Sequence, residues 1–244
     1  MIQNVLCFLE ESAEAYPHKT AFADEHTSLT YRRLSDLSMR IGSVLGQKTG
    51  PRRPVPVLAE KNVFTLTAFM GIVRAGCFYV FLDAGQPAER LNRILDTLQA
   101  DLMIADKESL SLAGPVSFSG EILPLEDLMS LPDDALNPGL LASIRRQSTD
   151  TDPLYGIFTS GSTGVPKGVV ASHRSVIDFI GHFTDLFHIT QDDIIGNQAP
   201  FDFDVSVKDI YSALKTGATL EVIPKKLFSI PTGLLDYLCD RKIT

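Results

Sequence analysis

The chain has 244 residues, of which 44% are hydrophobic and 21% are charged, so its composition is that of an ordinary globular protein. Its formal net charge of −8 argues against a nucleic-acid-binding protein, because such proteins normally present a basic face. The three cysteines, Cys7, Cys77 and Cys239, fit neither a metal-ligand spacing nor a disulfide framework, and we expect them to be buried free thiols.

The first 106 residues alternate between short apolar runs and segments with a helical hydrophobic period. A first helix is predicted to end near Tyr16, and a strand follows over 21–24. Thr30 is a plausible N-cap for a helix that reaches about Gln47. The next predicted elements are a strand over 54–59, a helix over 62–76, a strand over 77–83, a helix over 87–100 and a strand over 101–106. This alternation is typical of a parallel-sheet α/β architecture.

The sequence predicts neither a secretory signal nor a membrane-spanning segment. The N-terminus lacks a basic region and turns acidic at Glu10. The most apolar stretch, 63–73, is well short of the ~20 residues that a membrane span needs. We therefore expect a cytoplasmic protein with no membrane partner and no nucleic-acid partner.

Residues 107–150 lose this periodicity and are rich in Ser, Pro, Gly and Asp, which indicates a connecting region. The expected organisation is a first α/β subdomain with its connecting segment over 1–150 and a second, incomplete α/β segment over 151–244. In the second segment we expect strands at 155–159, 168–172, 193–198 and 218–224, and helices at 175–187, 206–214 and 231–241.

A polar loop, TSGSTGVPKG, occupies 159–168 between two of these strands. It is not a Walker nucleotide loop, which needs Gly before the Lys and Ser or Thr after it. A flexible linker is a weak alternative, because strands adjoin the loop and Pro166 stiffens it. We interpret it as an anion-binding loop suited to a polyphosphate. Its candidate ligands are Thr159, Ser160, Gly161, Ser162, Thr163, Gly164 and Lys167, although Lys167 is equally well explained as a solvated side chain.

This loop resembles the phosphate-loop motif of the adenylate-forming superfamily, which includes acyl-CoA synthetases, luciferases and the adenylation domains of peptide synthetases. The stretches SLTYRRL, RAGCFYVFLDAGQPAERL and FDVS resemble further motifs of that family, in the family's order. The second stretch departs from its motif at Arg74, Phe81 and Ala84, and its Arg90 is expected to form a structural salt bridge. NQAPFDFDVSVKDIYSALKTGATL is similar to the corresponding region of D-alanine–carrier protein ligases. The resemblance covers the whole chain and implies the layered parallel-sheet subdomains of the family's N-terminal region.

The resemblance also implies a reaction. A carboxylate attacks the α-phosphate of ATP, an acyl-adenylate forms, and pyrophosphate leaves with Mg²⁺. The phosphopantetheine thiol of an acyl carrier protein then captures the acyl group. ATP and Mg²⁺ are therefore the expected cofactors, and an amino acid, with D-alanine favoured, is the expected substrate. We assign no catalytic residue and no metal ligand in this chain. The alternatives are an adenylation domain of a peptide synthetase for another amino acid and a truncated ligase that binds a nucleotide or a partner without chemistry.

The segment FDFDVS contains the expected substrate-binding residues. From the residue pattern alone, Asp204 is best explained as the cap of the following helix. The resemblance instead favours Asp204, rather than Asp202, as the partner of the substrate's α-ammonium group, since an amine entering a mostly apolar pocket must be paired. Phe203 and Val205 are expected beside the pocket, and Lys208 is expected to be solvated.

The later motifs of the family, NxYGPTE and Y(K/R)TGD, do not occur in the sequence, and neither does the C-terminal lid with its lysine. We therefore expect an N-terminal portion of a longer ligase that folds but is impaired in catalysis.

Overall fold

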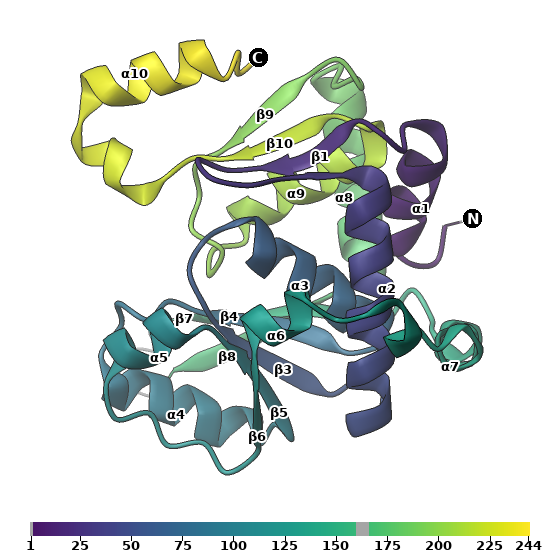
Figure 1. The fold of residues 1–244 in the computed structure, drawn as a ribbon, viewed down its shortest axis with the longest axis vertical. Coiled ribbons are helices and arrows are strands. Elements are labelled where there is room, and N and C mark those ends of the chain that lie inside the picture. Colours follow the sequence, from purple (N-terminus) through teal and green to yellow (C-terminus); the bar gives the residue numbers. More distant parts are fainter. Residues whose placement is uncertain (1, 160–165) are drawn as a thin grey trace.

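The computed structural model describes residues 2–159 and 166–244, and the strands in these ranges form two sheets (Figure 1). Sheet A has four strands in the order β2-β1-β10-β9, with bounds Ser28–Thr30, Thr20–Ala23, Thr219–Val222 and Ile194–Asn197. Sheet B has six strands in the order β6-β5-β3-β4-β7-β8, with bounds Glu121–Pro124, Leu102–Ala105, Pro54–Leu58, Phe78–Leu82, Pro153–Thr159 and Lys167–Ser172.

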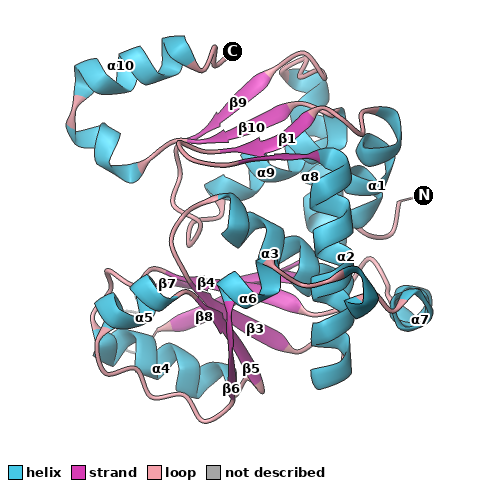
Figure 2. Ribbon diagram, in the orientation of Figure 1, coloured by secondary structure: helices cyan, strands magenta, loops and turns pink. Residues whose placement is uncertain are grey.

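The helices form layers with these sheets (Figure 2). Helices between or beside the two sheets are α1 (Leu6–Ala15), α2 (Tyr31–Lys48), α3 (Val63–Arg74), α8 (His173–Leu186) and α9 (Val205–Thr216). Helices α4 (Ala88–Leu98) and α5 (Lys107–Ala113) cover the far face of sheet B. The remaining helices are α6 (Leu125–Met129), α7 (Pro138–Gln147), α10 (Pro231–Asp240) and the 3₁₀ turns η1 (Asp133–Ala135) and η2 (Lys225–Ser229). This layered α/β architecture confirms the predicted fold class.

The interior strands of both sheets are parallel, as expected from the alternation of strands and helices. In sheet B, β3 pairs in parallel with β4 and β5, and in sheet A, β10 pairs in parallel with β1 and β9. Two edge strands are antiparallel to their neighbours, because β2 runs antiparallel to β1 and β8 runs antiparallel to β7. The three-residue strand β2 was not predicted at all, since it is too short to show a period.

The burial of β4 on both faces of sheet B explains why its sequence is one continuous apolar run. Tyr79 and Phe81 pack in the larger core between the sheets, whereas Phe78, Val80 and Leu82 pack with α4 on the opposite face. Alternate side chains of a strand point to opposite faces, so a sheet covered on both sides needs apolar residues at every position.

Residues 107–150 are more ordered than a connecting region was expected to be. They form α5, β6, α6, η1 and α7, and β6 extends sheet B in parallel with β5. These elements are short and their proline and serine content is high, so no hydrophobic period is visible in the sequence. Both sheets cross the division expected at residue 150, because β1 pairs with β10 and β4 pairs with β7.

The helix ends follow the expected capping chemistry. The Thr30 side chain accepts a hydrogen bond from the Arg33 amide at 3.2 Å and caps α2. Helix α8 begins at His173, two residues earlier than expected, because the Ser172 side chain accepts from the Ser175 amide. Side-chain capping of the first free amides thus fixes where these helices begin.

The cysteines only partly match the expectation of buried thiols. Cys77 is buried, Cys7 is half-buried, and Cys239 is exposed because α10 presents it to solvent. Among the described helices, none is both long enough and apolar enough to cross a membrane.

Helices α2 and α3 approach each other closely at two glycines. A Cβ on Gly71 would lie 2.3 Å from Cγ2 of Ile41, and a Cβ on Gly42 would lie 2.4 Å from Cβ of Arg74. Neither position has room for a methyl group, so the helix packing that supports both sheets depends on these glycines.

We expect Gly71→Ala to lower the free energy of unfolding by about 1–3 kcal/mol, because the added methyl group would force α2 and α3 apart. The matched control is Gly181→Ala on α8, where an added Cβ meets no described atom within 4 Å. The control should raise the unfolding free energy by about 0.5–1 kcal/mol through helix propensity. Urea unfolding followed by circular dichroism measures both, and equal effects of the two variants would contradict the close packing.

Candidate functional site

A cavity of about 1060 Å³ lies where strands of both sheets end. Its lining includes residues that lie one to three positions after β1, β3, β4, β9 and β10, namely Asp24, Lys61, Asp83, Gln198 and Pro224. In open α/β sheets, ligands bind outside the carboxyl ends of the strands. We therefore take this cavity as the candidate site.

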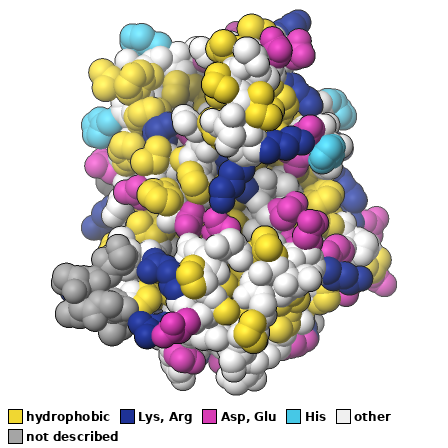
Figure 3. All heavy atoms as spheres, turned by 90° about the vertical axis from the view of Figure 1, so that its left-hand side faces the viewer, with side chains coloured by type: hydrophobic (Ala, Val, Ile, Leu, Met, Phe, Trp, Pro, Cys, Tyr) yellow, Lys and Arg dark blue, Asp and Glu magenta, His cyan; other side chains and the backbone are white. Residues whose placement is uncertain are grey.

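Opposite charges are paired along the cavity rim. Lys225 Nζ lies 3.1 Å from Oδ2 of Asp83, and Lys226 Nζ lies 2.7 Å from Oε2 of Glu25. Both lysines belong to η2, so these pairs connect η2 to the end of β4 and to the β1–β2 loop. Figure 3 shows basic and acidic side chains interleaved across the middle of the molecule. The rim is therefore close to neutral in charge.

Lys61 connects the carboxyl ends of the two sheets. Its Nζ donates to the carbonyl oxygens of Asn197 at 2.9 Å and Gln198 at 3.1 Å, at the end of β9, and lies 3.4 Å from the carbonyl oxygen of Ile223 after β10. It also lies 5.7 Å from the ring centroid of Phe201. Burial lowers the pKa of Lys61 to about 8. One ammonium group thus holds the loop after β3 against two strand ends of the other sheet.

Phe201 packs the connection between β9 and α9 against the sheet B side of the core. Its ring is buried and makes edge-on contacts with Phe69 at 5.6 Å and Phe81 at 5.5 Å between ring centroids. Aromatic pairs in this geometry contribute beyond their buried area. The turn that follows Phe201 is therefore fixed relative to sheet B, although it leaves from sheet A.

The start of α9 places the expected substrate-binding residues at the cavity. Phe203 and Val205 line the cavity, with 56% and 49% of their surfaces exposed. Asp204 lies between them and is exposed, and within the described part of the chain its side chain makes no capping hydrogen bond. Burial, and to a lesser extent the Asp204 carboxylate, raise the pKa of Tyr155. Asp204 therefore lies near β7, with its carboxylate uncommitted to the cap that the residue pattern alone suggested.

Lys208 is not simply solvated, as was expected, but lines the cavity. Its Nζ lies 2.5 Å from Oδ1 of the buried Asp209, whose Oδ2 accepts from Nδ2 of Asn197 at 3.0 Å. The lysine bends back to this carboxylate because Asp209 is held in place by β9. The cavity wall is therefore charge-balanced here as well.

The described ends of the polar loop form the mouth of a hairpin. Thr159 and Lys167 face each other across β7 and β8, and both are exposed. Of these two residues, neither is among those that line the cavity. The expected ligands Ser160, Gly161, Ser162, Thr163 and Gly164 lie outside the described residues.

Several site residues were not identified from the sequence. Lys61, Asn197 and Asp209 received no role, although a polar residue directly after an apolar strand, as in PVPVLAEK, is a usable signal. Instead of the expected salt bridge, Arg90 donates to the carbonyl oxygen of Phe158 and to the side chain of Gln86. No sequence pattern reveals such a contact, because it joins segments far apart in the chain.

In nucleotide sites Mg²⁺ is usually held by one or two carboxylates together with the phosphates of the substrate. Within residues 2–159 and 166–244, no group of three His, Cys, Asp or Glu side chains is arranged to hold a metal ion. We therefore derive no step through Mg²⁺.

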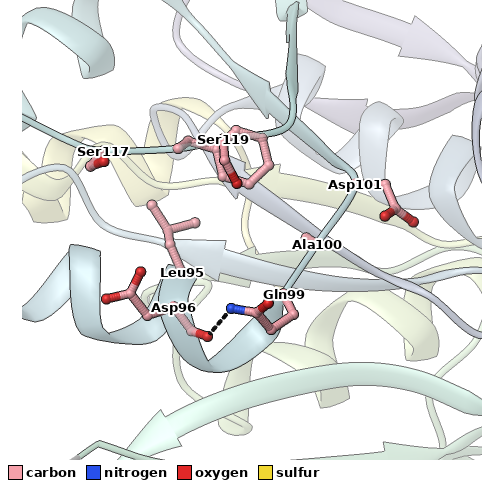
Figure 4. A pocket seen from close by; sticks show the side chains of 8 residues that line it. Leu95, Asp96, Gln99, Ala100, Asp101, Ser117 and Ser119 are labelled. Atoms are coloured by element: carbon pink, nitrogen blue, oxygen red, sulfur yellow. Dashed lines mark hydrogen bonds between the residues drawn. The ribbon is translucent and has the colours of Figure 1, made fainter.

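A second, shallower pocket of about 260 Å³ lies beside the C-terminal end of α4 (Figure 4). Its lining includes Asp96 and Gln99, and the Gln99 side chain donates to the Asp96 carbonyl oxygen at 2.7 Å. The Gln99 amide is thus already hydrogen-bonded at the C-terminal end of α4, and we assign no ligand to this pocket.

Comparison with known proteins decides the family. The profile described as "AMP-binding enzyme" matches residues 9–244. The chain belongs to the AMP-binding enzyme family.

Curated relatives of this AMP-binding chain include three bacterial proteins. Surfactin synthase subunit 1 of Bacillus subtilis (strain 168) is 36% identical over 231 residues, which cover 93% of this chain and 6% of the relative. Tyrocidine synthase 1 of Brevibacillus parabrevis is 30% identical over 96% of this chain and 21% of its own length. D-alanine--D-alanyl carrier protein ligase of Staphylococcus aureus (strain MRSA252) is 31% identical over 94% of this chain and 44% of its length. The chain thus spans less than half of each relative.

Solved structures give the same result for the fold of the AMP-binding chain. The AMPPNP-bound form of the nonribosomal peptide synthetase FmoA3 matches with a TM-score of 0.87 and 26% identity, over 99% of this chain and 25% of that chain. The N-terminal subdomain of Klebsiella oxytoca NpsA matches with a TM-score of 0.81 and 19% identity, over 100% of this chain and 60% of that chain. The second match supports the fold alone. Together they confirm the predicted resemblance to the N-terminal region of adenylate-forming enzymes.

The lowered pKa of Lys61 predicts a specific pH dependence of stability. In the folded protein this pKa is about 8, below its value of 10.5 in the unfolded chain. Between these values the unfolded chain holds a proton that the folded protein has released, so the contribution of Lys61 to stability rises with pH. The free energy of unfolding of the wild type, relative to that of Lys61→Met, should therefore increase by roughly 1–2 kcal/mol between pH 7.5 and 9.5. Urea unfolding at both pH values measures the difference, and a constant difference would show that Lys61 is not desolvated.

Proposed function

We propose that the protein carrying this chain activates an amino acid as its aminoacyl-adenylate at the expense of ATP and transfers it to the phosphopantetheine thiol of a carrier protein, in the cytoplasm. Family membership supports the use of a nucleotide. Relatives named as a carrier protein ligase and as peptide synthetases support an amino acid and a carrier protein.

The observation that carries the proposal is the uncommitted carboxylate of Asp204. It lies between two cavity-lining residues at the start of α9, and no capping hydrogen bond uses it within the described chain. The N-terminus of a helix favours nearby negative charge, and this carboxylate lies at the N-terminus of α9. We infer that Asp204 pairs with the α-ammonium group of the substrate, while Phe203 and Val205 contact the rest of the amino acid.

The phosphate part of the site is proposed on the polar loop. Thr159, Ser160, Gly161, Ser162, Thr163, Gly164 and Lys167 would hold the departing phosphates through hydroxyl, amide and ammonium donors. Within the described residues, β7 supports this assignment, because the strand that ends at Thr159 also carries Tyr155, the neighbour of Asp204. The proposed ammonium-binding residue and the proposed phosphate-binding loop would thus both adjoin strand β7.

Among substrates, a neutral amino acid is favoured, and D-alanine is our first choice. Among the described residues that line the cavity, each lysine (Lys61, Lys208, Lys225 and Lys226) is already engaged by a carboxylate or carbonyl oxygen, so none is free to pair with an acidic side chain. The relative at 31% identity named for D-alanine supports this choice.

An adenylation domain for a larger amino acid is the second candidate. The cavity of about 1060 Å³ is larger than D-alanine requires, and a subunit of surfactin synthase is 36% identical. Amino-acid-dependent ATP–pyrophosphate exchange with a panel of neutral amino acids, measured on the intact protein that carries this chain, separates the two candidates.

We expect Asp204→Asn to abolish the preference of the chain for ligands that carry an α-amine. The two probes are alanyl-sulfamoyl-adenosine and its propionyl counterpart, which lacks only the amine. The wild type should bind the alanyl probe roughly 10- to 100-fold more tightly, because a charge-assisted hydrogen bond contributes about 1.5–3 kcal/mol. Calorimetric titration measures both affinities. Asp96→Asn, which removes an acid in the second pocket, is the control, and an undiminished preference in Asp204→Asn would refute the assignment.

We also propose that the 244-residue chain alone is impaired in catalysis, since it spans 44% or less of the curated relatives compared above. It should show very low ATP–pyrophosphate exchange with D-alanine. Turnover comparable to that of intact ligases would contradict this prediction.

A further inference from the structure

Three consecutive hydrogen bonds connect the turn over 202–205 to the end of β7. Nε2 of Gln86 donates to Oδ2 of Asp202 at 3.0 Å. Nε of Arg90 donates to Oε1 of Gln86 at 2.8 Å, and an Arg90 Nη2 group donates to the carbonyl oxygen of Phe158 at 3.0 Å. The path thus begins two residues before Asp204 and ends one residue before the polar loop.

The geometry of α4 keeps this path short. Gln86 directly precedes the N-cap Pro87 and Arg90 lies in the first turn of α4, so their side chains meet at the N-terminal end of the helix. The backbone of Gln86 is held in turn, because its amide donates to the carbonyl oxygen of Asp83 at 3.0 Å. All three side-chain bonds are partly buried, so water competes for them less than at an open surface.

Asp202 has more hydrogen-bonding capacity than this path uses. Its Oδ1 atom is buried and has no partner among the described residues. Burial, reinforced by the nearby Asp83 carboxylate, raises the pKa of Asp202, whereas the bond from Gln86 and the charge of Lys225 oppose that rise. The hydrogen bond from Asp202's own backbone opposes the rise most, and the bond from Gln86 is the side-chain hydrogen bond that adds to it.

We propose that Asp202, Gln86 and Arg90 are positioning residues of the candidate site, which fix the turn bearing Asp204 against the strand that leads into the polar loop. The inference rests on the proposed function, because positioning matters only if Asp204 binds an ammonium group. It assigns a role to Asp202, which the FDFD sequence alone could not distinguish from a spare carboxylate.

The path also makes the turn sensitive to pH. When Asp202 takes up a proton, its bond from Gln86 loses the assistance of the negative charge and weakens. The charged groups facing Asp202 are Asp83 after β4 and Lys225 of η2, with Arg90 of α4 acting through Gln86. The turn should therefore be held less firmly as the pH falls through the raised pKa of Asp202.

Hydrogen exchange of the intact 244-residue chain tests the connection without any ligand. Gln86→Leu removes both side-chain bonds of Gln86 at similar volume. We expect exchange of the Phe203, Ser206 and Val207 amides, which are bonded within or next to the turn, to become about 3- to 10-fold faster. Glu89→Gln, which changes an exposed α4 side chain bonded to Arg93, should leave the exchange rates of these amides unchanged.

Gln86→Glu serves as a second variant, because its carboxylate would repel Asp202 while retaining the bond from Arg90. Unchanged exchange at the turn in a folded variant overturns the inference.

A pH profile separates positioning from a merely structural role. Asp202→Asn keeps an acceptor for Gln86 but removes the charge. At pH 8 the wild type should bind alanyl-sulfamoyl-adenosine about 3- to 10-fold more tightly than Asp202→Asn, and the ratio should fall toward one as the pH is lowered through the raised pKa of Asp202. A ratio that does not change with pH overturns the positioning role of the charge.

The two experiments distinguish the failure of this inference from the failure of the proposed function. If the wild type binds no aminoacyl-adenylate analogue, the proposed function fails and the positioning role fails with it, while exchange still decides whether the connection exists. If the analogue binds but Gln86→Leu leaves the turn unchanged, the proposed function stands and the connection is refuted.

Discussion

The arrangement of the site depends on how the carboxyl ends of the two sheets are held together. Lys61, after the central strand β3, donates to carbonyl oxygens at the end of β9, and Phe201, after β9, packs on Phe69 and Phe81 of the sheet B side. A side chain that follows a strand of each sheet therefore contacts residues on the side of the other sheet. Without this junction the cavity would have no fixed shape, since its lining comes from strand ends in both sheets.

Most of the fold could be predicted because its strands are buried on both faces. Such strands read as continuous apolar runs, as in β3 and β4, and the helices between them show clear periods. The elements that were missed, β2 and those of 107–150, are short and contribute few core side chains. The antiparallel pairing of β7 with β8 agrees with the short connection between them, because parallel strands need a crossover of a dozen or more residues.

The candidate site was predictable only in part. The resemblance to the adenylate-forming family identified Asp204 and the polar loop, whereas the residue pattern alone left Asp204 as a helix cap. The structure removes that alternative within the described chain, since the carboxylate makes no capping bond. Arg90 was misjudged because the carbonyl oxygen that it contacts belongs to Phe158, a residue distant in sequence. Contacts of that kind leave no local pattern to read.

The pairing of β1 with β10 has a consequence for how the chain folds. Phe22 faces Leu220 across sheet A, so the partners are about 200 residues apart, and closing such a long loop delays the contact. The six strands of sheet B all lie between Pro54 and Ser172, so sheet B can assemble before β10 has been synthesised. The pairing of β1 with β10 is therefore expected among the later contacts to form within the described chain.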